Sequence, residues 1–276
     1  MFIALYVTND TLDKTKLGMC LATPYFTQDQ EFITVTIYPF SLSLVAACAV
    51  MAGNASAHAG ADTGGIQSKS AAAVKAPYDI VRSKITTDGN VAVFHMQVSG
   101  KAGAMKPRKS GKLAGSTVYS YVWPTTMDPS VVGFEAKSGI LAFAVTAHPD
   151  FDDTPLFPAP LGTWHAHWVV LSPDDACGKG ALKVVDIPQG IRPKLPKTWP
   201  GLPILIDSPG WVPRFKGGTV EVRVPFDDIG AVNAANFDGV TAALRVNASV
   251  HSPLLCVVDV FKVASGDLSL PGKVNQ

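Results

Sequence analysis

The sequence predicts an all-β protein, built as a single antiparallel β-sandwich or barrel-like domain with a long proline-rich loop and little helix. Short runs rich in valine, threonine and aromatic residues recur along the chain, and these residues are enriched in strands. Between the runs lie turn-forming residues, drawn from 24 glycines and 21 prolines. Apolar residues make up 47% of the chain and charged residues 16%, which is enough for a packed core.

The expected strands follow one another at short spacing. Residues 78–100 form the clearest unit, because two alternating runs flank Asp88-Gly89, a strong hairpin signal. In the second run Ala92, Phe94, Met96 and Val98 share one face, and His95 lies on the other. The remaining expected strands lie within 116–124, 139–148, 162–171, 181–188, 218–226, 239–250 and 254–263.

Two segments do not have a strand pattern. Residues 226–237 predict the one short helix, with Asp227 and Asp228 near its start. Residues 187–213 contain seven prolines, too many for a helix or a central strand. We therefore expect a long ordered loop there.

The N-terminal part has the pattern of a targeting segment. An apolar run ends in Ala57-His58-Ala59, which matches an A-x-A cleavage pattern. Two alternatives stay open: a retained membrane anchor, and lipid attachment at Cys48, since Val45-Ala46-Ala47-Cys48 resembles a bacterial lipobox. The expected division is an upstream extension over 1–33, a signal peptide over 34–59, a flexible leader over 60–76 and the β-sandwich domain over 77–276. We expect an exported protein, periplasmic or extracellular, with no membrane span once processed.

The cysteine count agrees with export. Cys20 and Cys48 lie in the part expected to be removed, which leaves Cys177 and Cys256. An even pair in an oxidising compartment predicts a disulfide. Two separate thiols are the alternative.

The most distinctive stretch is "GTWHAHWVVL", residues 162–171. Successive side chains of a strand point to opposite faces, so His165 and His167 should share one face. Two neighbouring imidazoles suit Zn or Cu. The candidates for further ligands are His148, His95, Asp150, Asp152 and Asp153. The three aspartates also raise the less favoured alternative of Ca²⁺.

The string His165-Ala166-His167-Trp168 resembles the zinc strand of α-carbonic anhydrases, where two strand histidines precede a tryptophan. The resemblance implies that His165 and His167 are two of three zinc ligands. It covers four residues, and the third histidine that this family supplies soon afterwards has no counterpart before His251. Copper/zinc superoxide dismutases also carry a strand HxH, but their glycine-rich, histidine-dense loop is absent here.

The favoured function is therefore an exported protein that binds Cu or Zn. The second hypothesis is a metal-free module for a small ligand, a glycan or a protein partner, and a zinc-dependent enzyme comes third. Ser208 lacks the G-x-S-x-G pattern of a hydrolase nucleophile. The net charge of +1 argues against nucleic-acid binding. The aromatic residues that could stack on a ligand are Trp123, Trp164, Trp168, Trp199, Trp211, Tyr119 and Tyr121.

Overall fold

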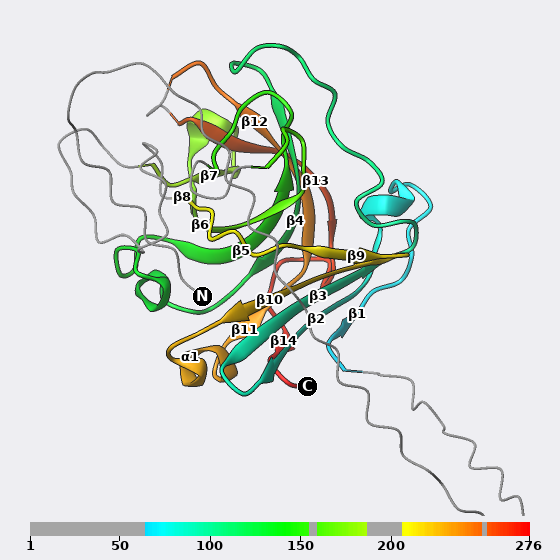
Figure 1. Ribbon diagram of the computed structural model, residues 1–276, viewed down its shortest axis with the longest axis vertical. Helices are drawn as coiled ribbons and strands as arrows, with labels where there is room; N and C mark the ends of the chain where they lie inside the picture. Colours follow the sequence, from blue (N-terminus) through cyan, green and yellow to red (C-terminus); the bar gives the residue numbers. More distant parts are fainter. Residues whose placement is uncertain (1–63, 155–158, 187–205, 250–252) are drawn as a thin grey trace, which may run out of the picture. The chain divides into compact units, whose positions relative to one another are not determined.

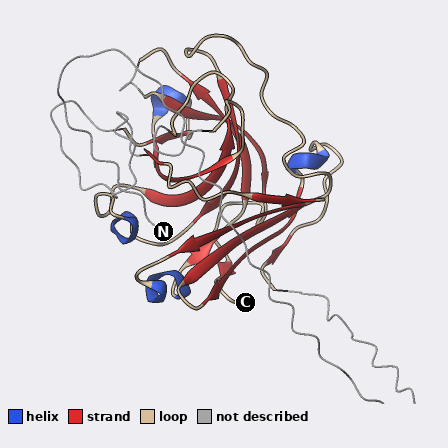
Figure 2. Cartoon of the chain, in the orientation of Figure 1, coloured by secondary structure: helices blue, strands red, loops and turns tan. Residues whose placement is uncertain are grey.

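A computed structural model describes residues 64–154, 159–186, 206–249 and 253–276. Strands dominate these residues, and the single α-helix, α1, is short (Figure 2). The strands are β1 (Ile66–Gln67), β2 (Ile80–Asp88), β3 (Val91–Val98), β4 (Thr117–Pro124), β5 (Ile140–Ala147), β6 (His165–Pro173), β7 (Leu182–Val184), β8 (Ile206–Asp207), β9 (Arg214–Lys216), β10 (Thr219–Pro225), β11 (Asn236–Phe237), β12 (Val240–Val246), β13 (Leu255–Val263) and β14 (Gly272–Lys273). The helices are α1 (Ile229–Asn233) and the 3-10 turns Ala76–Tyr78, Pro129–Val132 and Asp175–Cys177.

Six strands close into an antiparallel barrel (Figure 1). Their order is β5-β4-β12-β13-β7-β6, and β6 pairs again with β5 to complete the ring. Strand β8 adds to the edge of β6, where Trp168 pairs with Asp207.

The second large sheet has the order β1-β2-β3-β10-β9 and packs on the outside of the barrel. Successive side chains of a strand point to opposite faces, so the barrel strands contribute to two separate apolar cores. Trp123 on β4 and Trp168 on β6 face the second sheet, where both contact the ring of Phe94. Their sequence neighbours Val122 and Val169 point to the opposite face and belong to the separate apolar cluster inside the barrel. The inward faces of β5 and β6 are therefore the faces that a site within the barrel must use.

These observations confirm the all-β antiparallel prediction, with a closed barrel and additional sheets as its form. The hairpin turns at Asp88-Gly89, where Gly89 has a φ of 58°, a backbone conformation that glycine adopts readily. The helix lies within the expected 226–237. Of the proline-rich segment, Ile206–Asp207 is strand β8 rather than loop, and 187–205 lie outside the described residues.

Residues 64–76 are the described part of the segment for which the sequence predicts a flexible leader. This part carries β1, which pairs with β2, and Gly65 N–H donates to the carbonyl of Gln276. Further along, Ala71 N–H donates to the Asp79 carboxylate. Backbone hydrogen bonds therefore hold this segment of small and polar residues against the rest of the fold. The expected extension (1–33) and signal peptide (34–59) lie outside the described residues.

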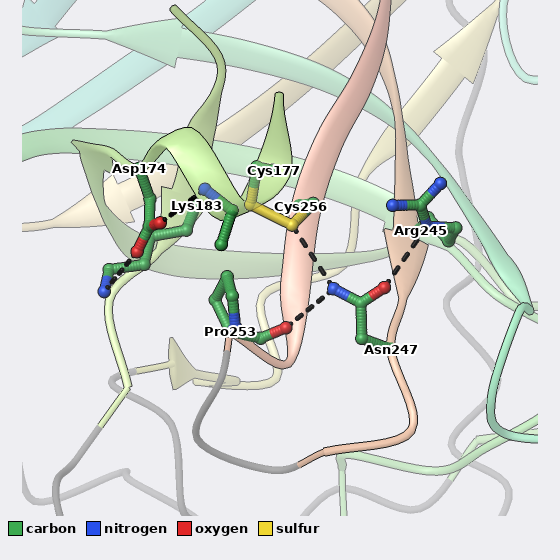
Figure 3. The surroundings of a disulfide bond; sticks show 8 residues. Asp174, Cys177, Lys183, Arg245, Asn247, Pro253 and Cys256 are labelled. Carbon is green, nitrogen blue, oxygen red and sulfur yellow. Dashed lines mark hydrogen bonds and ion pairs between the residues drawn. A yellow bond between two sulfur atoms is a disulfide. The ribbon is translucent and has the colours of Figure 1, made fainter. Parts of the chain in front are cut away.

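Cys177 and Cys256 form the predicted disulfide, with their Cα atoms 5.3 Å apart (Figure 3). The bridge joins the turn Asp175–Cys177 to β13. Asn247 supports it by donating to the Cys256 sulfur and to the Pro253 carbonyl, at 3.3 Å and 2.7 Å. The disulfide thereby fixes the barrel strand β13 against the connection between β6 and β7.

Replacing both cysteines, Cys177→Ala and Cys256→Ala, should lower the free energy of unfolding by about 2 to 4 kcal/mol. The bridge closes a loop with a sequence separation of 79, and its loss frees that loop in the unfolded chain. Urea unfolding of wild type and double variant measures the difference. In the mature protein, which lacks Cys20 and Cys48, two reactive thiols after denaturation without reduction would contradict the bridge.

Candidate metal centre

The site lies where strands β5 and β6 meet at one end of the barrel. In their antiparallel register Thr146 pairs with His165, so His148, just after β5, arrives beside the start of β6. His165 and His167 project from the same face of β6, and His167 lines the cavity inside the barrel, while Trp164 and Trp168 pack in the outer core. The alternation expected of the HxH strand is therefore present.

Four side chains converge there: His148, Asp153, His165 and His167. One ligand atom from each lies within 4.8 Å of every other. The Nε2 atoms of His148 and His165 are 3.0 Å apart. The Asp153 carboxylate lies 2.9 Å from His165 Nε2, 3.2 Å from His148 Nε2 and 3.7 Å from His167 Nε2. The separations approach the edge of a tetrahedron with bonds of 2.0–2.1 Å, which is about 3.3 Å.

In two of the three histidine rings, the nitrogen that points away from the centre already makes a hydrogen bond. His148 Nδ1 lies 3.0 Å from the Phe151 carbonyl, and His165 Nδ1 lies 2.8 Å from the Thr163 carbonyl. A carbonyl only accepts, so both Nδ1 atoms carry hydrogen and donate. Both Nε2 atoms are then left facing the centre. Partners of this kind orient metal-binding histidines in known sites.

This arrangement requires a positive species at its centre. Two neutral imidazoles that both carry hydrogen on Nδ1 point lone pairs at each other across the 3.0 Å between His148 and His165. The Asp153 carboxylate adds negative charge at the same place. Either a proton on one ring or a cation relieves the repulsion.

Burial and charge set the protonation of the group. Burial lowers the pKa of His167 to about 3, so its imidazole is neutral at neutral pH. Burial opposes ionisation of Asp153, but the neighbouring imidazoles outweigh it and hold the pKa of that carboxyl well below its usual range. Burial likewise opposes charge on His165, yet the hydrogen bond that its ring donates to the Asp153 carboxylate raises its pKa. A neutral imidazole and an ionised carboxylate are the forms that bind metal.

The structure does not bring the other candidate ligands to this centre. His95 lies on β3 in the second sheet, between Lys84 and Glu221 on the neighbouring strands. The Asp150 carboxylate accepts from the N–H groups of Ser110 and Gly111. Of Asp150, Asp152 and Asp153, which raised the less favoured Ca²⁺ alternative, only Asp153 points to this centre, so the three do not form an oxygen-rich loop site. Three nitrogens and one carboxylate are also not the all-oxygen shell that Ca²⁺ takes.

The remaining candidates occupy different places. Asp152 accepts from the backbone N–H and hydroxyl of Thr154, which ties it within its own loop. His251 lies outside the described residues. Only Asp153 of the acidic loop reaches the histidines, because the loop after β5 returns over the end of the barrel.

Sequence reasoning considered Ser208 only as a nucleophile and missed its contact with the site. Its hydroxyl lies 2.9 Å from His167 Nδ1, and the side chain is buried. Ser208 follows β8, whose pairing with β6 places it there. No local pattern links residues 167 and 208, so only the strand pairing reveals the contact.

Removing this hydroxyl tests its role. We expect Ser208→Ala to weaken metal binding about 10- to 100-fold, the usual effect of losing a partner that orients a ligand. The reason is that the ring of His167 would lose the contact that fixes its orientation. Competition with a chelator measures the affinity. An unchanged affinity would show that Ser208 does not position His167.

The aromatic residues do not form a platform for stacking a ligand. Trp123, Trp168 and Tyr121 are at most 2% exposed, and Trp164 is 7% exposed. They fill the core between the barrel and the second sheet. Tyr119 and Trp211 are partly buried against that core, and Trp199 lies outside the described residues. This removes most of the support for glycan binding.

None of the helices in the described ranges has the length and apolarity that a membrane span needs. Comparisons with protein-family models, with curated proteins and with solved structures gave no match to this chain.

Proposed function

We propose that this protein binds one transition-metal ion, Zn²⁺ or Cu²⁺, through His148, Asp153, His165 and His167. One observation carries the proposal: three imidazole nitrogens and a carboxylate point at one buried centre, within 4.8 Å of one another. Nitrogen and carboxylate donors without sulfur suit Zn²⁺ and Cu²⁺.

The donor count favours a structural or metal-handling role over catalysis. Catalytic zinc usually has three protein ligands and a fourth position open to water or substrate, whereas structural zinc has four protein ligands. Here four protein donors are available, and only His165 has appreciable exposure, with 16% of its side chain accessible. A zinc-dependent enzyme would need one of these donors to withdraw.

Calorimetry of the metal-free protein tests the proposal. Zn²⁺ and Cu²⁺ should each bind at one tight site per chain, while Ca²⁺ should give no tight binding under the same conditions. The relative affinities of Zn²⁺ and Cu²⁺ would then identify the better-fitting metal. Binding of neither Zn²⁺ nor Cu²⁺ at micromolar concentration would refute it.

We propose further that the protein is exported to the periplasm or beyond the cell. The A-x-A pattern at Ala57-His58-Ala59 and the Cys177–Cys256 disulfide support this. The expected mature protein begins near Gly60. Mass spectrometry of the N-terminus, on protein from its natural compartment, provides the measurement. Recovery of residues 1–59 in that material would contradict cleavage.

A further inference from the structure

The barrel encloses a cavity of about 100 Å³. Its wall is almost entirely aliphatic, with contributions from β4, β5, β6, β12 and β13. The few polar side chains gather at one end of the cavity: Ser120, which pairs with Thr146 across β4 and β5, and Thr146, His148, Asp153 and His167. The cavity is therefore apolar along its length, with a single polar end.

The cavity results from the choice of side chains on the inward faces. On β4 the inward positions include Val118, Ser120 and Val122, while the outward positions carry Tyr121 and Trp123. On β5 the inward Ala144 lies beside the outward Phe143. On β12 the inward Ala242 is equally small. Protein interiors are normally close-packed, so the small inward residues of β4, β5 and β12 leave room for a guest.

A second observation points to a ligand at the polar end. Within the described part of the chain, the Thr146 hydroxyl is buried and has no hydrogen-bond partner. Thr146 is 7% exposed and lines the cavity. A buried hydroxyl without a partner costs free energy, and such groups usually find one. An oxygen atom on a guest molecule would supply that partner.

We propose that the barrel binds a small, neutral aliphatic molecule with one oxygen-bearing end, such as an alcohol or a ketone. Its chain occupies the aliphatic cavity and its oxygen accepts a hydrogen bond from Thr146. An apolar cavity of about 150 Å³ holds the six carbons of benzene, so this one, at about two thirds of that volume, suits a chain of about four to five carbons. In the metal-free protein the polar end carries the Asp153 carboxylate, and no lysine or arginine is among the lining residues that the structure describes, which disfavours an anionic end. This is a second ligand, and its binding does not require the metal.

The probes are 1-pentanol, followed by NMR titration, and xenon, which fills apolar cavities without hydrogen bonding. In metal-free wild-type protein both should perturb residues of the barrel interior. Ala242→Leu should weaken both at least tenfold, because the added carbons occupy the cavity. Thr146→Val keeps the shape and removes the hydroxyl, so it should weaken 1-pentanol about three- to tenfold and leave xenon unchanged.

Ser83→Ala is the matched control. It removes another buried hydroxyl that has no hydrogen-bond partner among the described residues, on β2 and away from the cavity lining. It should change neither probe. No binding of either probe to the wild type, or binding that Ala242→Leu leaves unchanged, would overturn the proposal. If Ala242→Leu does not fold, an unchanged 1-pentanol affinity in Thr146→Val overturns the head-group contact.

The tests of the metal site and of the cavity ligand can fail independently of each other. Ala242→Leu should retain the metal affinity of wild type, since Ala242 is not one of the four proposed ligands. Loss of 1-pentanol binding with intact Zn²⁺ binding locates the guest in the cavity. Absence of metal binding in wild type leaves the 1-pentanol test fully valid.

Discussion

The double variant His165→Ala and His167→Ala should lose roughly a thousandfold or more in affinity for Zn²⁺. Losing one outer partner of a ligand already costs 10- to 100-fold, and this change removes two of four proposed ligands. The two that remain, His148 and Asp153, cannot complete a tetrahedral shell. Competition with a chromophoric chelator covers the necessary range of affinities.

His95→Ala is the control for this experiment. His95 is also a strand histidine, but it lies on β3 and outside the four-residue cluster. Its replacement should leave the affinity for Zn²⁺ unchanged. If wild type and the double variant bind Zn²⁺ equally, the centre is not a metal site, and the two histidines serve only the packing and hydrogen bonding of the barrel end.

The second large effect is on thermal stability. At a free Zn²⁺ concentration 1,000 times the dissociation constant, binding to the folded state alone adds about 4 kcal/mol. For a folded region of this size, that raises the melting temperature by about 8 to 16 °C. The reason is that the ligands come from β6, the end of β5 and the loop between them, which separate on unfolding. Thermal unfolding in chelator and in buffered Zn²⁺ measures the shift.

The double histidine variant sets the baseline for that shift. It should melt at the same temperature in chelator and in Zn²⁺. A shift of equal size in the variant would show that Zn²⁺ stabilises the protein elsewhere, and no shift in wild type would exclude tight binding to the folded state.

The local patterns were predictable because they depend on short-range geometry. The period of two along a strand placed His165 and His167 on one face, and the Asp88-Gly89 pair predicted the hairpin. The disulfide followed from the count of cysteines and the expected compartment. The sequence also predicted His148, at the end of the expected 139–148 strand, as a further ligand.

The long-range features were not predictable from the same patterns. Ring closure depends on β6 pairing with both β5 and β7, and alternation alone does not specify which strands are neighbours. That is why a sandwich and a barrel could not be separated. His95 has the same strand pattern as the true cluster members but lies in the other sheet. Ser208 reached His167 through the pairing of two-residue β8, for which the sequence has no strong signal.

The sequence predicted that an aspartate of the loop after 139–148 could bind the metal, but it did not identify Asp153 as that residue. Asp150, Asp152 and Asp153 are chemically equivalent in the sequence. In the structure Asp150 accepts from the loop at Ser110, Asp152 accepts from Thr154, and Asp153 turns inward to the histidines. Only the path of the loop distinguishes them, because it determines which donors each carboxylate can reach.

X-ray absorption at the zinc or copper edge, on protein loaded with one equivalent of metal, tests the central claim most directly. The account predicts three imidazole nitrogens and one carboxylate oxygen as nearest neighbours, at about 2.0–2.1 Å for zinc. The outer-shell scattering of three imidazole rings should also be visible, and it should be lost in the His165→Ala, His167→Ala double variant. A shell of oxygen atoms without imidazole, or a spectrum identical in the double variant, would contradict it.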